Sequence, residues 1–198
     1  MQYEEIFTLL LDFIFRIIIF GLIFIHKEQM LGILRYVDSN PHFFHIHTFN
    51  NEKEKWNEGQ IISTQNRGKR IFKYPKRFRE EEFENIRQRS FENFPSRYTC
   101  LFLSKDMDTA KIWLDKLFNR CNFIQCVEVE LLSGKYVYVD EQIYNIENFS
   151  KKTMIEEAFS YWNGYEVEND RILTILFEGQ FRVCGVKDIH NINDILLH

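Results

Sequence analysis

The sequence lacks the cysteine pattern of a metal site or of a secreted, disulfide-linked domain. It has four cysteines in 198 residues, and Cys121 and Cys126 are five positions apart with no second Cys or His pair at ligand spacing. We therefore expect buried free thiols, a reducing cytosol and no bound metal.

Motifs for nucleotide binding and for hydrolysis are also missing. The chain has no glycine-rich dinucleotide fingerprint, no phosphate-binding Gly-Lys-Ser/Thr loop, no identifiable Ser–His–Asp set and no internal repeat. Its net charge of −4 does not by itself indicate a nucleic-acid partner. The common nucleotide-binding folds are therefore not indicated, and function has to be sought in other patterns.

Aromatic residues are abundant, because they make up 16% of the chain and 20 of them are Phe. This composition predicts a packed core, and alternating segments predict an α+β fold in which strands outnumber helices. Strands are expected at residues 42–49, 59–63 and 98–104, in a hairpin of 122–132 with 136–140 around Gly134, and in a hairpin of 171–179 with 180–186 around Gly179. Helices are expected at residues 80–93, 109–118 and 151–162.

The N-terminal segment is a long apolar run. Sixteen of the twenty residues at 6–25 are apolar, which is the length of a membrane-spanning helix, but Asp12 and Arg16 interrupt it and make insertion marginal. Three interpretations stay open: a membrane anchor, a helix packed on the domain or on a second copy, and an upstream extension with the true start at Met30. Alkaline carbonate extraction of the full chain distinguishes the first. We divide the chain into this helix and linker (1–40) and one domain (41–198).

Two short motifs and the order of the expected elements carry a family resemblance. Pro95-Ser96-Arg97 precedes the middle strand, and Tyr161-Trp162-Asn163-Gly164 precedes the last strand region. Across about residues 42–187, a strand with His, a middle strand with Phe and a late strand with Glu resemble the ADP-ribosyltransferase superfamily of the His–aromatic–Glu type, closest to a bacterial branch of unknown function. The resemblance implies split antiparallel sheets with flanking helices, preceded here by the apolar N-terminal helix.

The resemblance also implies transfer of ADP-ribose from NAD to a macromolecule, in the setting of a bacterial toxin or defence effector. Glu178 would be the catalytic carboxylate that stabilises the oxocarbenium-like transition state, and His45 would bind the adenine-side ribose, with His47 as the alternate. A second register puts Thr174 at the carboxylate position. In that case the domain binds NAD without transfer, or uses Glu166 or Asp170 instead.

Three further residues are implied in cofactor binding. Arg97 would lie near the NAD phosphates or help to order the middle strand, and its alternative role is a structural ion pair. Tyr98, the next residue, is the second cofactor-binding candidate. Phe102 would stack on nicotinamide, with a place in the plain core as the alternative.

Residues 67–79 form a strongly basic run with seven Lys and Arg side chains and three interleaved aromatics. This composition fits single-stranded nucleic acid, and it also fits a solvated loop, an anionic lipid surface or part of the NAD diphosphate site. The leading hypothesis is an NAD-dependent transferase in a cytoplasmic domain, tethered to the inner face of the membrane if residues 6–25 anchor it. The alternatives are an inactive nucleotide-binding module on the same fold and a membrane-associated interaction protein.

Overall fold

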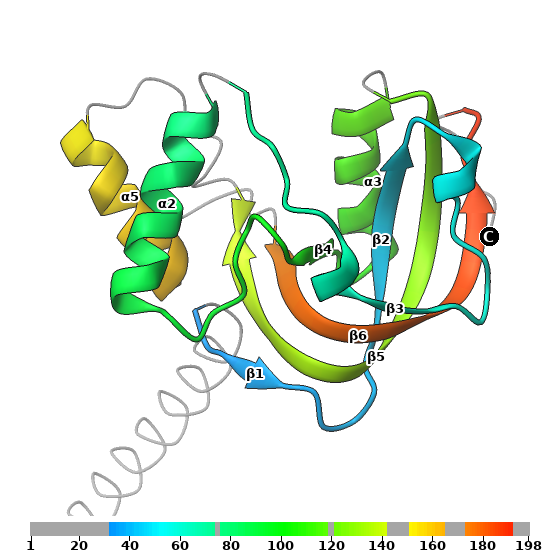
Figure 1. The fold of residues 1–198 in the computed structure, drawn as a ribbon, viewed down its shortest axis with the longest axis horizontal. Helices are drawn as coiled ribbons and strands as arrows, with labels where there is room; N and C mark the ends of the chain where they lie inside the picture. The colour runs from blue at the N-terminus through cyan, green and yellow to red at the C-terminus, as the bar shows by residue number, and fades with distance from the viewer. Residues whose placement is uncertain (1–31, 74–75, 119–120, 142–150, 165–172, 192–198) are drawn as a thin grey trace, which may run out of the picture.

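The computed structural model describes residues 32–73, 76–118, 121–141, 151–164 and 173–191 (Figure 1). These residues form a mixed α/β domain with a curled antiparallel sheet of six strands and three α-helices. The expected helix at residues 6–25 lies outside the described residues. In the part of the chain that is described, no helix has the length and apolarity needed to cross a membrane.

Two long strands form the centre of the sheet. β5 runs from Phe123 to Asp140 and β6 from Leu173 to Asp188, and they pair antiparallel along almost their whole length. The two expected hairpins are therefore wrong, because the chain continues through each glycine instead of turning back. Gly134 and Gly179 lie opposite each other in the register, next to a register shift, and both have positive φ. The long pair bends there, as Figure 1 shows for the curved ribbons of β5 and β6.

Four short strands flank the long pair, two on either side of the bend. They are β1 (Arg35–Tyr36), β2 (His42–Phe49), β3 (Ile61–Ser63) and β4 (Leu101–Leu103). On one side of the bend, β2 pairs with the first half of β5 and β3 pairs with the second half of β6. On the other side, β1 pairs with the second half of β5 and β4 pairs with the first half of β6. Where two separate small sheets are expected, the strands form two lobes of one connected sheet. A bridge between Phe44 and Ser104 also joins β2 to the end of β4.

The helices cover two different parts of the sheet. α2 (Lys76–Ser90) and α5 (Lys151–Asn163) lie side by side at one end, and α3 (Met107–Leu117) packs beside β2 (Figure 1). α2 begins four residues earlier than expected and takes up the end of the basic run. Asp106 begins α3 by accepting a hydrogen bond from the backbone N–H of Thr109 at 2.8 Å. Two short 3-10 helices span Glu52–Glu54 and Thr64–Asn66.

Three apolar clusters fill the spaces between these layers. One lies between the sheet and α2 with α5, and Trp162, Tyr161 and Phe83 are its largest buried side chains. The second lies inside the curl of the sheet and includes Trp56 and Phe177. The third joins β2 to α3. The strand faces that line these clusters determine which polar side chains reach a pocket.

Candidate functional site

Both candidate histidines point to the inside of the curled sheet. They alternate with outward residues along β2, so His45 and His47 share one face with Phe43 and Phe49. Each is more than nine-tenths buried. Their rings stack beside Trp56, with centroid distances of 5.3 Å for His45 and 4.0 Å for His47.

The hydrogen bond of His45 fixes its tautomer. Its Nδ1–H donates to the carbonyl oxygen of Phe102 at 2.8 Å, so the neutral ring keeps Nε2 as an acceptor. Burial lowers the pKa of His45 well below its usual value, and the charge of Arg67 lowers it further. Nε2 has no hydrogen-bond partner among the described residues. This nitrogen is therefore suited to accept a hydrogen bond from a ligand hydroxyl.

His47 is held in a similar way. Its Nε2–H donates to the carbonyl oxygen of Glu54 at 2.9 Å, and its Nδ1 is buried without a partner in the described part of the chain. Burial lowers the pKa of His47, so it too is held neutral.

Phe102 brings the β4 strand into contact with two arginines. The guanidinium of Arg70 lies 4.2 Å from the centroid of the Phe102 ring, and that of Arg97 lies 5.0 Å from it. Phe102 also packs against the cluster under α2 and α5. The ring therefore contributes to the core, and a cation covers it where nicotinamide was expected to stack.

Arg97 is part of a buried ionic network. It donates to Glu80 of α2 at 2.9 Å, to Glu141 after β5 and to the hydroxyl of Tyr161 on α5. Burial alone would lower the pKa of Arg97, but the charges of Glu141 and Glu80 outweigh it and hold the pKa well above its usual value. These contacts favour the structural alternative for Arg97 over a contact with the NAD phosphates.

Arg67 and Arg70 have no carboxylate partner among the described residues. Arg67 lies over the ring of Trp56 at 5.3 Å, and one of its Nη atoms is buried without a hydrogen bond there. Burial, followed by the charge of Arg70, lowers the pKa of Arg67 to about 10. In the described part of the chain, neither guanidinium is in direct contact with a carboxylate, and Glu80 and Glu141 act on Arg70 only at longer range. Arg67 therefore keeps hydrogen-bond donors that suit an anionic ligand.

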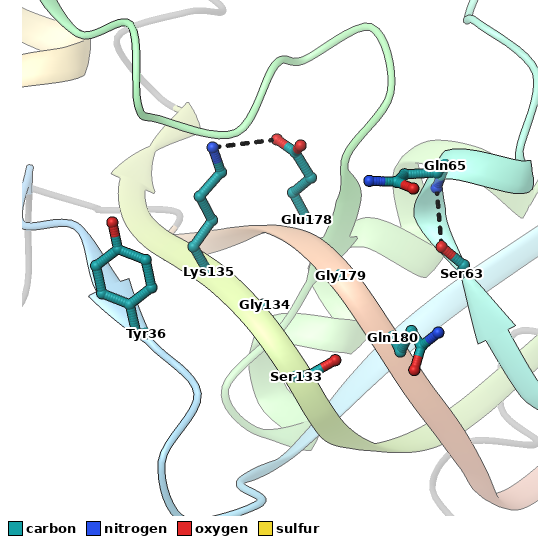
Figure 2. Close-up of a pocket in the computed structure, with 9 residues that line it drawn as sticks. All are labelled: Tyr36, Ser63, Gln65, Ser133, Gly134, Lys135, Glu178, Gly179 and Gln180. Carbon is teal, nitrogen blue, oxygen red and sulfur yellow. Dashed lines mark hydrogen bonds and ion pairs between the residues drawn. The ribbon is translucent and has the colours of Figure 1, made fainter.

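Glu178 lies at the wall of an open pocket of about 540 Å³ (Figure 2). Lys135, its register partner on β5, approaches it at 3.8 Å between Nζ and Oε2. Figure 2 shows both side chains on the same side of the strand pair, with the amide of Gln65 pointing toward Glu178 from the opposite wall. The lining is polar, and Ser63, Ser133, Tyr36 and Gln180 complete it around the two glycines.

The bend in the sheet gives this pocket its floor. Gly179 donates its backbone N–H to the hydroxyl of Thr64 at 3.1 Å. This hydrogen bond connects the 3-10 helix that precedes Arg67 to β6 next to Glu178. Thr174, the other candidate at the carboxylate position, is fully buried and accepts a hydrogen bond from the indole of Trp113 at 3.1 Å. Of the two positions, Glu178 is therefore the one in contact with a pocket.

The structure brings some of the candidates together and separates others. His45 contacts β4 at Phe102, and Phe102 shares a sheet face with Glu178, because Phe102 pairs with Leu176 two residues before it. The ring of His45 is on the other face, in the cluster that contains Phe177. Glu166 and Asp170 lie outside the described residues.

Tyr98 belongs to a second hollow of about 520 Å³, between the basic run and α2.

Sequence reasoning did not single out Lys135, Trp56 or the two unpaired arginines as site residues. The basic run contained the arginines, but nothing in its pattern separated Arg67 and Arg70 from the more exposed charges. No group of His, Cys, Asp and Glu suited to a metal ion occurs in the described ranges.

Comparison with known proteins gives one family match. No curated protein matches the chain. Residues 70–191 match the family described as "Protein of unknown function (DUF2441)", and this region contains the Arg97 network, Phe102, Lys135 and Glu178. Since the match covers more than half of the 198 residues, the chain belongs to the DUF2441 family.

Proposed function

We propose that this protein binds NAD and transfers its ADP-ribose group to a macromolecule, in a domain of the ADP-ribosyltransferase type. The observation that carries the proposal is the position of Glu178, a half-buried carboxylate at the wall of a polar pocket of about 540 Å³. A pocket of this volume is in the usual range for a small-molecule site.

The chemistry requires a carboxylate next to the ribose. Breaking the bond between nicotinamide and ribose leaves positive charge on the sugar, which a fixed negative charge stabilises. In the proposed complex the Glu178 carboxylate faces that ribose, and the amides of Gln65 and Gln180 offer donors and acceptors to the sugar hydroxyls. Lys135 keeps the carboxylate oriented through the ion pair.

The unpaired arginines support an anionic ligand. Arg67 and Arg70 are partly buried, lack a carboxylate in the described structure and lie on the segment that Thr64 ties to Gly179. A diphosphate would supply the missing negative charge, since the guanidinium donates two parallel hydrogen bonds to phosphate oxygens. Since His45 lies on the sheet face opposite Glu178, its Nε2 would accept a hydrogen bond from the adenine-side ribose and not from the reacting one.

A second candidate function is a nucleotide-binding module without transfer. The ion pair with Lys135 favours it, because a carboxylate already neutralised by an ammonium stabilises a developing cation less well. Incubation with NAD labelled on its adenylate phosphate, together with a lysate, separates the two functions. Label bound to protein or nucleic acid supports transfer, free ADP-ribose supports hydrolysis, and calorimetric binding of unchanged NAD supports the module.

A further inference from the structure

Positive charge is concentrated in one segment of an otherwise acidic chain. Residues 67–79 contain seven basic side chains and no acidic one, whereas the whole chain has a net charge of −4. Lys69, Lys73, Lys76 and Arg77 are exposed on this segment. A local surface of this kind attracts polyanions despite the net charge of the protein.

A hollow of about 520 Å³ opens between this segment and α2. Its cations are Lys69, Arg70 and Arg77, and its aromatic walls are Phe72 and Tyr98. The rings of Phe72 and Tyr98 are nearly perpendicular, with their centroids 5.4 Å apart, and the ammonium of Lys69 lies 4.4 Å from the centroid of Tyr98. Basic and aromatic side chains therefore alternate around one cavity.

The acids near the hollow are already paired. Glu81 accepts from Arg77 at 2.7 Å, and Glu84 accepts from Arg87 at 2.7 Å. Lys73 and Lys76 have no carboxylate partner among the described residues, and neither has Arg70. The free charge at the rim is thus positive, and Asn85 adds an amide that can bond to a base edge.

We propose that this hollow is a binding site for single-stranded nucleic acid. A base stacks on Tyr98 in place of the Lys69 ammonium. Lys69 and the exposed Lys73 and Lys76, which follow it on the same segment, bind the phosphates on either side. A cavity with aromatic walls favours a strand with separate bases over a lipid surface, which requires no cavity. The binding of the strand does not depend on the transfer of ADP-ribose. The further step, in which the bound strand accepts the ADP-ribose group, rests on the proposed function.

Fluorescence anisotropy with labelled single-stranded DNA and RNA, measured without NAD, tests the site. Replacing Lys69, Lys73 and Lys76 by Gln should weaken binding and reduce the slope of log K against log salt by about 2, or roughly 0.7 for each of the three lost phosphate contacts. The matched control replaces Lys105, Lys111 and Lys116, at and before α3, and should bind like the unchanged protein. An unchanged slope, or equal weakening in the control, would overturn the proposal.

Stacking is tested at Tyr98 on the same full chain. Tyr98→Leu should weaken binding of the oligonucleotide about tenfold or more, whereas Tyr98→Phe, which keeps the aromatic ring, should bind like the unchanged protein. Vesicles of anionic lipid serve as the competing surface. Binding to such vesicles without binding to either oligonucleotide, or equal affinities for the Leu and Phe variants, would show that the hollow is not a nucleic-acid site.

Discussion

Two buried neutral histidines make the stability of this domain dependent on pH. The folded protein holds the pKa of both His45 and His47 below the usual value, mainly because burial disfavours the charged ring. In the unfolded chain each titrates near 6.5. Their contribution to stability is therefore complete above about pH 6.5 and is lost as the pH falls toward the folded pKa.

Urea unfolding as a function of pH measures this effect. We expect the free energy of unfolding to fall below pH 6.5 by roughly 1.4 kcal/mol per pH unit for each of the two histidines. The double variant His45→Gln with His47→Gln should give a flatter curve. A curve of the unchanged protein that is flat between pH 6.5 and 5 would show that the rings are not held neutral.

The buried ionic network around Arg97 leads to a second prediction at the residue scale. Arg97→Met would remove the buried cation that Glu80 and Glu141 both contact, and breaking such a buried pair costs about 3–5 kcal/mol. Chemical denaturation should show this loss. Arg77→Met, which removes an exposed pair with Glu81, should change stability little. Similar effects of the two substitutions would contradict the assignment of Arg97 to the core.

At this scale the roles of the candidate residues stay predictions, and the sequence did not show which partners they contact. Glu178 is the only acid in residues 171–179, and it lies at the wall of a pocket, but its catalytic role stays a prediction. A structural ion pair was already an alternative for Arg97, but its partners come from α2 and from the end of β5, which are distant in sequence. Single-sequence patterns contain no information on such long-range contacts, so the network could not be predicted.

At the scale of elements, Gly134 and Gly179 determine the shape of the sheet. A Cβ built on Gly179, where φ is +155°, would lie 2.0 Å from the carbonyl oxygen of Ser133. Gly179→Ala should therefore destabilise the domain by at least about 2 kcal/mol and disturb the neighbouring Glu178. Gly68→Ala, where a Cβ would meet open space, should change stability by under about 1 kcal/mol. Thermal unfolding compares them, and equal effects would show that the bend tolerates a side chain.

The same glycines explain why both hairpins were predicted wrongly. A glycine between two alternating apolar segments is typical of a tight turn, but it is equally typical of a bend in one long strand. The difference depends on which partner pairs across the glycine, and here β5 and β6 pair with each other on both sides of it. By contrast, β2 and α5 follow from local composition and pattern, because β2 is rich in aromatic and β-branched residues and α5 has the pattern expected of a helix.

At the scale of the whole molecule, two pockets lined by described residues differ in charge. One lies at the bend of the sheet and contains the carboxylate of Glu178, and the other lies against α2 and is rimmed by cations. Arg70 contributes to the second pocket and also covers Phe102, whose strand pairs with the Glu178 strand. In our account the first pocket holds the reacting ribose and the second holds the macromolecule.

The transfer reaction tests this account most directly. The full chain should attach label from adenylate-labelled NAD to a macromolecule, and Glu178→Gln should reduce the rate at least about 100-fold, because the carboxylate acts on the transition state. Glu130→Gln is the matched control, since Glu130 is also a β5–β6 carboxylate in an ion pair, with Arg182 at 2.5 Å. Equal rates for the Glu178→Gln variant and the unchanged protein, with both folded by circular dichroism, would contradict the assignment of Glu178. Absence of any labelled acceptor would contradict transfer itself.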